Sequence, residues 1–535
     1  MKDIHYLREA NFEESLQRSI LDLVNYHLSG GALHIVADEA EIIAPVIKAG
    51  LYGQETRRYR QELGGVITSF EQLLDMPGMN NVILGDLASV AKLVDRDKLK
   101  ELAPQTTWNN EVTPFVNGPK CLEMMLDEIR KAERYVHLSM MLFFNDHSGN
   151  LVAEELLAAL NRGVKVRLMV NSTLTALGYE KNLAFGKFGE ISDKLTAAGA
   201  QIRNTFDSYY SAEEWKSRRQ ELKDQGVPER ILFLQDKVQE DVEISGLNVI
   251  DHRKFIIIDG ITSIIGSLNI GDQYTYETPI DASPTESVEG IELGIPGKEE
   301  EWHDGCFRIR GGVATTLNSV FHSRWLLLGG DRFDVNDSYY SPAIDLRFGE
   351  EECTIFVSFP GNPVNLIQQY YLDLITYACD ETLIVNPYLI DQDFWDRLKE
   401  LGPDCSCHLT LCNSLLVNDH PTNRAAVRSN MYTPFCNGVS FYDYSNTGRF
   451  SHWKISYDKR SNAVFHGSYN INERSACHDF ELGLLVKGKS FADKVRKMID
   501  YDLSVSRKIT DKNEFFKHPW LHPSTYLNAA TRNFT

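Results

Sequence analysis

Two segments of the chain repeat one pattern of residues that can act on phosphate esters. HRKFIIIDGITSIIGSLN, residues 252–269, recurs 200 residues later as HWKISYDKRSNAVFHGSYN, residues 452–470. Each holds His-x-Lys, then an Asp, then Gly-Ser-x-Asn. A neutral imidazole can attack phosphorus, and an ammonium group beside it stabilises the phosphoryl transition state. The repeat predicts two facing half-sites, which together supply a nucleophile and a general acid for the departing alcohol.

The spacing predicts which side chains project together. Residues two apart on a strand face the same side of a sheet, so we expect His252 beside Lys254 and His452 beside Lys454. The same rule pairs the serine and asparagine of each Gly-Ser-x-Asn motif on the following strand. We expect these side chains to donate hydrogen bonds to phosphate oxygens: Ser267, Asn269, Ser468 and Asn470.

Four carboxylates complete the predicted catalytic set. Asp304 and Glu481 each stand seven residues before a glycine. We expect each to accept a hydrogen bond from the far ring nitrogen of the histidine in its own copy, which fixes the tautomer. Asp259 follows its lysine after four intervening residues, whereas Asp458 follows after three. A shift of one residue reverses the face of a strand, so Asp458 is expected to act differently from Asp259.

Each motif alone has an ordinary explanation. A lone His-x-Lys usually lies on the surface, and Gly-Ser-x-Asn alone is a common turn signal. The occurrence of both, twice, in the same order and at comparable spacing argues against coincidence.

The repeat extends upstream of the motifs, where it predicts the elements that position them. Residues 126–143 match residues 371–389 as a helix that closes on an alanine and is followed by a strand. Residues 162–172 similarly parallel residues 404–414. Apolar strands such as KVRLMV and FIIID alternate with helices, which is typical of an α/β sheet covered on both faces.

The predicted architecture is α/β, with two homologous sandwich halves that arose by tandem duplication. We assign residues 111–340 to the first half and 341–535 to the second, with a small α/β appendage of unreadable role at residues 1–110. Residues 211–241 interrupt the first copy and are rich in charge and helix formers. They predict a solvated helical hairpin or, because they enter next to the chemistry, a lid over the site.

Composition narrows the classes of function. The 535 residues carry a formal net charge of −20, which repels polyphosphate and argues against a nucleic-acid partner. The N-terminus lacks the apolar run of a signal peptide or membrane span, so we expect a cytoplasmic protein whose membrane contact is peripheral. The scattered cysteines predict a reducing compartment and no structural metal.

The motif pair resembles the signature of the phospholipase D superfamily, and the flanking segments resemble the cardiolipin synthases. Counterparts there include FVNGPKCLEMMLDEIRKA (115–132), GSLNIGDQY (266–274), VNPYLI (385–390) and NERSACHDFELGLLV (472–486). The resemblance covers roughly residues 110 to 515. It implies phosphatidyl transfer on glycerophospholipids through a phosphohistidine intermediate, without a metal or other cofactor.

Carried onto this chain, the resemblance makes His252 and His452 the catalytic pair, with His252 as nucleophile and His452 as general acid. Two alternatives stay open: a phosphodiesterase acting on nucleic acid, and a catalytically silent phospholipid-binding scaffold, which only the altered Lys454–Asp458 spacing supports. The residues leave open whether water or an alcohol accepts the phosphatidyl group.

Overall fold

A computed structural model gives the arrangement of most of the chain. It describes residues 105–171, 188–205, 212–227, 232, 235–236, 250–275, 302–335, 337–342, 346–360, 365–419, 421–447 and 449–526. Residues 1–104 of the predicted appendage lie outside this range, and the boundary predicted at residues 110 and 111 falls within strand β1. Of the predicted hairpin, the described residues include helix α11, and the lid remains a prediction.

The described strands form one 16-stranded sheet. The first half contributes β1 (Gln105–Val116), β2 (Tyr135–Met140), β3 (Lys165–Val170), β4 (Gln201–Asn204), β5 (Ile250–Asp251), β6 (Phe255–Ile258), β7 (Thr262–Gly266) and β8 (Gly305–Arg310). The second half contributes β9 (Glu351–Ser358), β10 (Thr382–Val385), β11 (Leu409–Asn413), β12 (Ser440–Asp443), β13 (Ile455–Asp458), β14 (Ala463–Gly467), β15 (Asp479–Lys487) and β16 (Arg507–Lys508).

Helices connect these strands in both halves. The first half holds α7 (Gly118–Arg130), α8 (His147–Asn161), α10 (Phe188–Ala197), α11 (Ala212–Asp224), α13 (Asp272–Thr275) and α14 (Val313–Leu327). The second holds α15 (Leu366–Thr376), α16 (Gln392–Glu400), α17 (Pro403–Ser406), α18 (Pro421–Asn430), α19 (Tyr432–Cys436), η5 (Tyr444–Thr447), α20 (Glu473–Cys477), α21 (Lys489–Val505), η6 (Lys512–Glu514) and η7 (Pro519–Leu521).

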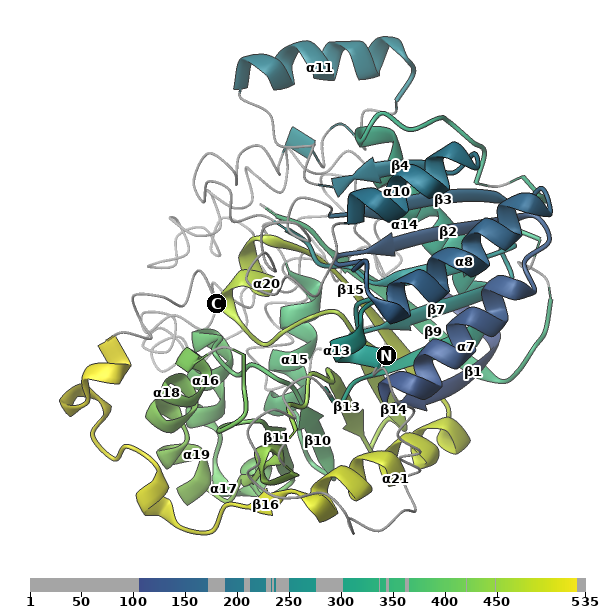
Figure 1. Ribbon diagram of the computed structural model, residues 1–535. Helices are drawn as coiled ribbons and strands as arrows, with labels where there is room; N and C mark the ends of the chain where they lie inside the picture. The colour runs from purple at the N-terminus through teal and green to yellow at the C-terminus, as the bar shows by residue number, and fades with distance from the viewer. Residues whose placement is uncertain are drawn as a thin grey trace, which may run out of the picture.

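The strand order repeats on either side of the pair β1–β9. Read outward, the first half runs β1-β8-β7-β6-β2-β3-β4 and the second runs β9-β15-β14-β13-β10-β11-β12, with β16 added at its outer edge. Because β1 and β9 pair in antiparallel fashion, the two halves join edge to edge about a pseudo-twofold axis (Figure 1). The prediction of two homologous α/β halves is confirmed.

Alternating residues of the central strands explain how helices cover both faces. Ile256 and Ile258 of β6 belong to a buried core beneath α7, α8 and α10. Phe255 and Ile257 face the other side, where they join a core that contains residues of both α14 and α21. A strand buried on both faces has no polar side to alternate with, so FIII reads as a continuous apolar run. The second core is shared by the two halves and holds them together.

A buried carboxylate anchors one short helix at the edge of the site. Asp146 caps α8 by accepting a hydrogen bond from the backbone of Gly149 (2.9 Å), and its second oxygen accepts one from the backbone of Asp272 (2.7 Å). Asp272 begins α13, so α13 is fixed against α8. This contact positions Tyr274, which reaches the site described below.

No helix within the described ranges has both the length and the apolar character needed to cross a bilayer. All nine cysteines are free thiols.

Candidate active site

The two halves exchange the carboxylates that orient their histidines. His252 Nδ1 lies 3.0 Å from Glu481 Oε1, and His452 Nδ1 lies 2.8 Å from Asp304 Oδ2. The expectation that each carboxylate serves the histidine of its own copy was therefore wrong. Each His–carboxylate pair is complete only when the two halves are assembled.

Backbone contacts reinforce the exchange. The backbone N–H of His252 donates to the carbonyl of Phe480 (3.0 Å), and β5, just before it, pairs in parallel with the start of β15. On the other side, the backbone N–H of His452 donates to the carbonyl of His303 (2.8 Å). Each histidine is thus held by backbone and side chain against the segment that carries the partner carboxylate.

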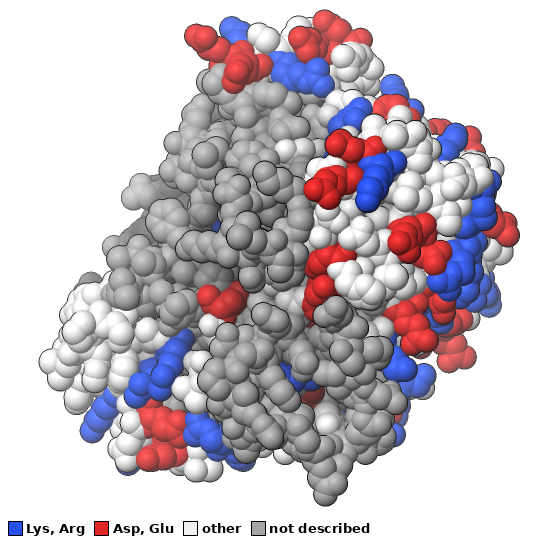
Figure 2. Space-filling model, viewed as in Figure 1, with Lys and Arg blue, Asp and Glu red and all other residues white. Residues whose placement is uncertain are grey.

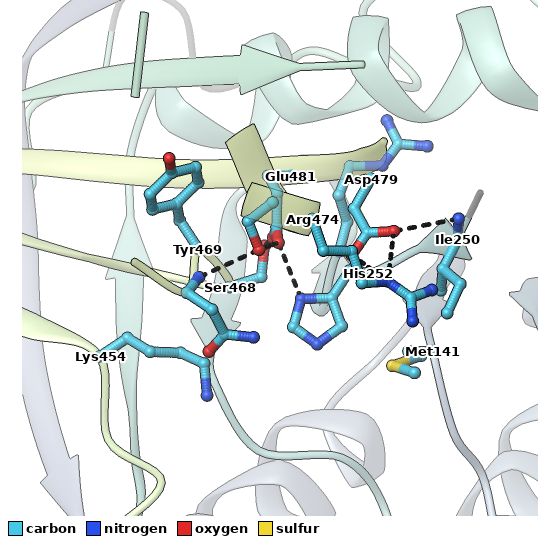
Figure 3. Close-up of polar contacts among 12 residues, drawn as sticks. Met141, Ile250, His252, Lys454, Ser468, Tyr469, Arg474, Asp479 and Glu481 are labelled. Atoms are coloured by element: carbon cyan, nitrogen blue, oxygen red, sulfur yellow. Dashed lines mark hydrogen bonds and ion pairs between the residues drawn. The ribbon is translucent and has the colours of Figure 1, made fainter. Parts of the chain in front are cut away.

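The His-x-Lys residues lie between strands and not on them. His252 and Lys254 fall in the extended segment between β5 and β6, and their counterparts precede β13. The lysines still reach the histidines: Lys454 Nζ lies 2.8 Å from His452 Nε2 and donates to the His452 carbonyl at 2.8 Å. In the first half, Lys254 donates to the His252 carbonyl at 2.7 Å. All four side chains are buried, and Figure 3 shows Lys454 and His252 projecting toward the same region of the site.

The serines of the two motifs donate hydrogen bonds to the carboxylates, although we expected them to donate to phosphate oxygens. The Ser267 hydroxyl donates to Asp304, and the Ser468 hydroxyl donates to Glu481 (Figure 3). The preceding glycine makes this possible, because a Cβ at Gly467 would lie 2.1 Å from the carbonyl oxygen of Leu482 on β15. The Gly-Ser pair thus lets the chain approach the next strand closely enough for the serine to orient the carboxylate.

The motif asparagines are both buried but differ in their contacts. Asn269 Oδ1 accepts from the backbone of Leu142 (3.1 Å), and its amide donates to the Tyr274 hydroxyl (2.8 Å). Asn470 Oδ1 has no hydrogen-bond partner among the described residues. The unpaired Oδ1 of Asn470 is an acceptor and cannot donate to a phosphate oxygen, so Asn470 stays a candidate phosphate ligand only through its amide N–H groups, whereas Asn269 is largely occupied.

Asp259 and Asp458 lie at the ends of β6 and β13 that are remote from the histidines. Asp259 accepts hydrogen bonds from the backbone N–H groups of three consecutive residues that lead into β2, Glu133, Arg134 and Tyr135. Asp458 instead accepts from the backbone of Ser461 (3.2 Å) and from its hydroxyl. The expected difference between the two is confirmed, but their contacts bind turns and neither residue reaches the histidines.

Burial and neighbouring charges set the protonation of the free site. Burial lowers the pKa of His252 to about 4 against the opposing effect of Glu481, and it lowers the pKa of His452 to about 3. Burial also lowers the pKa of Lys254 to about 8 and that of Lys454 to about 7. The pKa of each histidine is lowered by the lysine of the other half as well as by its own, so the two half-sites are electrostatically coupled. At neutral pH both imidazoles are neutral.

Several residues around the histidines escaped the sequence analysis. Four aromatic rings surround His452, with centroids at these distances from its ring: Trp302 (5.1 Å), Tyr274 (5.7 Å), Phe450 (5.8 Å) and Tyr388 (6.3 Å). On the other side, the Ser475 hydroxyl donates to Glu481 (2.6 Å), and the Arg474–Asp479 ion pair lies beside His252 (Figure 3). Trp302 could have been suspected from the sequence, because it stands two residues before Asp304, which the sequence analysis had already selected.

This geometry defines a class of site. Two neutral imidazoles, each oriented by a buried carboxylate and accompanied by a lysine, can supply a nucleophile, a general acid and charge for a phosphoryl group. Within the described ranges, no group of three or more His, Cys, Asp or Glu side chains is arranged to hold a metal ion. The site is that of a two-histidine phosphodiester-cleaving enzyme.

Comparisons with known proteins agree with this class. The model of the family described as "Cardiolipin synthase, PLD-like domain" matches residues 125–278 and 371–503, so the chain belongs to this family. Cardiolipin synthase 1 of Staphylococcus aureus is 24% identical over 85% of this chain and 81% of that protein. Cardiolipin synthase of Alkalihalophilus pseudofirmus is 24% identical over 88% and 82%.

A solved structure supports the fold. The crystal structure of phosphatidylserine synthase from Haemophilus influenzae matches with a TM-score of 0.52 and 13% identity, over 79% of this chain and 95% of that one. The resemblance to the phospholipase D superfamily and to the cardiolipin synthases is confirmed, and the duplicated family match confirms the tandem repeat.

Proposed function

We propose that the chain is a phospholipase D-type phosphatidyltransferase that acts on glycerophospholipids through a phosphohistidine intermediate, as a cardiolipin synthase does. The observation that carries the proposal is the exchange of carboxylates between the halves. It makes one site of two histidines, and two buried lysines beside them offset the charge of a phosphodiester. The names of the relatives indicate the phospholipid substrate.

In the first step, the Nε2 lone pair of His252 attacks phosphorus, and the bond from phosphorus to the alcohol oxygen breaks. His452 gives its Nε2 proton to that oxygen. The Nδ1–H of His252 stays bonded to Glu481, which stabilises the positive charge that develops on the ring. Lys254, Lys454 and the amide of Asn470 are proposed to hold the phosphoryl oxygens.

In the second step, the acceptor replaces the departed alcohol. His452, now neutral, takes the proton of the acceptor hydroxyl, whose oxygen attacks phosphorus and displaces His252. A lipid alcohol as acceptor completes phosphatidyl transfer, whereas water gives phosphatidic acid. Both outcomes use the same groups.

The contacts of the two imidazoles support this division of roles. Lys454 engages Nε2 of His452, and because the pKa of Lys454 is about 7 and that of His452 about 3, the proton between them resides on the lysine in the free site. Nε2 of His252 has no hydrogen-bond partner in the described part of the chain, so its lone pair is available for attack. A bound phosphodiester adds negative charge beside His452, which favours its protonated form.

The proposal extends to location: a cytoplasmic protein that meets its lipid by peripheral membrane contact. Product analysis by mass spectrometry with phosphatidylglycerol as sole substrate tests the activity. Cardiolipin with glycerol is expected, and phosphatidic acid with glycerol would mark water as the acceptor. Cleavage of single-stranded DNA without turnover of any phospholipid would contradict the proposal.

A further inference from the structure

We propose that the turn η7 and the residues after it dock on the surface of an anionic phospholipid bilayer. The exposed side chains of Trp520, Leu521 and Tyr526 form what we call the C-terminal patch. The inference gives the proposed function its membrane contact, but its binding test does not depend on catalysis.

The patch is apolar and open to solvent. Six large hydrophobic side chains are exposed among the described residues, and three of them lie between residues 520 and 526. Trp520 is 62% exposed, Leu521 69% and Tyr526 62%. Such clustering marks an interaction surface, because isolated exposed apolar residues are common but grouped ones are not.

Internal contacts hold the patch in place. The Tyr526 hydroxyl donates to the carbonyl of Trp520 (2.9 Å), and the rings of Phe516 and His522 stack with centroids 3.8 Å apart. The Thr525 hydroxyl lies 2.9 Å from that of Ser429 on α18. A patch fixed in its exposed conformation loses little conformational entropy on binding.

The surroundings of the patch are basic although the chain as a whole is acidic. Arg424 and Lys517 are exposed and form no ion pair within the described ranges. Arg428 lies over the ring of Phe516 at 4.6 Å and donates to the carbonyl of Glu514 (2.7 Å), while the Glu514 carboxylate is neutralised by Arg507. The yellow C-terminal segment at the left of Figure 1 coincides in Figure 2 with a largely white surface that has blue side chains at its border and red ones below them.

This combination fits a bilayer whose head groups are anionic. Tryptophan and tyrosine favour the interface between water and acyl chains because they are apolar with one polar atom. Lysine and arginine beside them are attracted to anionic lipids. A second copy of the chain fits less well, because a specific interface buries about 800 Å² per partner and three side chains fall short of that.

Helix α18 connects the patch to the catalytic site. Its last turn contacts the C-terminal segment through Arg428 and Ser429. Just before its first turn, Asp419 accepts a hydrogen bond from Tyr388 (2.6 Å), one of the rings around His452. A ten-residue helix is about 15 Å long, so docking at the patch brings lipid close to the site.

Vesicle co-sedimentation of the full chain tests the inference. We expect binding to vesicles of phosphatidylcholine with phosphatidylglycerol, and weaker binding to phosphatidylcholine alone or at high salt. The double variant Trp520→Ala/Leu521→Ala should bind at least about tenfold more weakly, because both side chains lose apolar burial. Trp108→Ala is the matched control, because Trp108 lies on β1 and is also 62% exposed.

The inference would be overturned if the double variant bound vesicles as tightly as the wild type. It would also be overturned if sedimentation velocity showed that the variant had lost self-association and not vesicle binding. Turnover of soluble bis(p-nitrophenyl) phosphate separates this result from the proposed function. The double variant should keep that turnover while losing activity on vesicles. If the wild type turns over neither substrate yet binds vesicles through the patch, the proposed function fails and the docking surface stands.

Discussion

The half-sites around His252 and His452 share a scaffold but differ in their surroundings. His452 lies among four aromatic rings and has Lys454 on Nε2, whereas no aromatic ring within the described residues packs on His252, which lies beside the Arg474–Asp479 ion pair. Aromatic faces stabilise a nearby cation, which suits an imidazolium that acts as an acid. The duplication thus placed one histidine in each half, and the different side chains around the two histidines suit them to different chemical roles.

The layer behind each histidine also differs. Behind His252, the ring of Phe480 lies under two guanidinium groups, Arg253 at 5.1 Å and Arg324 at 4.3 Å, which share the buried carboxylate of Asp251. Behind His452, the corresponding strand position holds His303, whose Nε2 lies 2.8 Å from Asp502 Oδ2. The same backbone exchange is therefore supported by unrelated side chains, which indicates that the exchange is the feature the site requires.

The largest expected effect separates the two histidines. His252→Ala should lower turnover of every substrate by at least about 10⁴-fold, because the covalent route is lost. His452→Ala should lower turnover of phospholipids by about 10²- to 10⁴-fold, yet lower turnover of a p-nitrophenyl ester by less than about tenfold, since an acidic alcohol departs unprotonated. Steady-state kinetics with both substrates checks this. Equal losses of turnover in the two variants on the p-nitrophenyl ester would contradict the claim that the two histidines have different roles.

The carboxylates should follow the exchanged pairing. Asp304→Asn should resemble His452→Ala, with a selective loss on phospholipids, and Glu481→Gln should resemble His252→Ala, with a loss of about 10²-fold or more on both substrates. The measurement is a double-mutant cycle, in which Asp304→Asn should add little to His452→Ala because the two act as a unit. If the effects of Asp304→Asn and His452→Ala on turnover were additive, and those of Asp304→Asn and His252→Ala were coupled, each carboxylate would act on the histidine of its own copy.

The pH profile should report the unequal charges of the free site. As pH rises, kcat/KM should increase through about pH 4 as His252 deprotonates, and should decrease above pH 7 to 8 as Lys454 and then Lys254 lose their protons. Lys454→Arg keeps a positive charge but cannot pass a proton to His452, so turnover of phospholipids should fall strongly, whereas on a p-nitrophenyl ester, which needs no general acid, the alkaline decline should move to higher pH. A decline that stays at pH 7 in this variant would assign it to another group.

The smallest effect concerns the two aspartates that were expected in the catalytic set. Asp259→Ala should lower the free energy of unfolding by about 2–4 kcal/mol, because three backbone N–H groups lose an acceptor. Asp458→Ala should lower it by less than about 1 kcal/mol, because its contacts are local and exposed. Denaturant titration measures both, with Asp259→Asn as the control that keeps one acceptor. Loss of kcat in the folded Asp259→Ala variant, with unchanged stability, would return the residue to the catalytic set.

The sequence predicted the repeated helices and strands, but it did not predict that the His-x-Lys residues lie between strands or how the two halves assemble. The repeat of helix and strand predicted β2 with β10 and β6 with β13, because apolar periodicity and spacing are local properties. Which carboxylate meets which histidine depends on the pseudo-twofold docking through β1 and β9, and no local pattern encodes it. The serines were misassigned for a related reason, since their partners, Glu481 on β15 and Asp304 directly before β8, approach them only through tertiary packing.

Covalent trapping tests the central claim most directly. A p-nitrophenyl phosphodiester should be mixed with His452→Ala, which is expected to slow release of the intermediate, and quenched in alkali, where phosphohistidine survives. Peptide mass mapping should then place the adduct on His252. An adduct on any other residue in this variant, or one found on His452 when the wild type is trapped, would contradict the division of labour between the two half-sites.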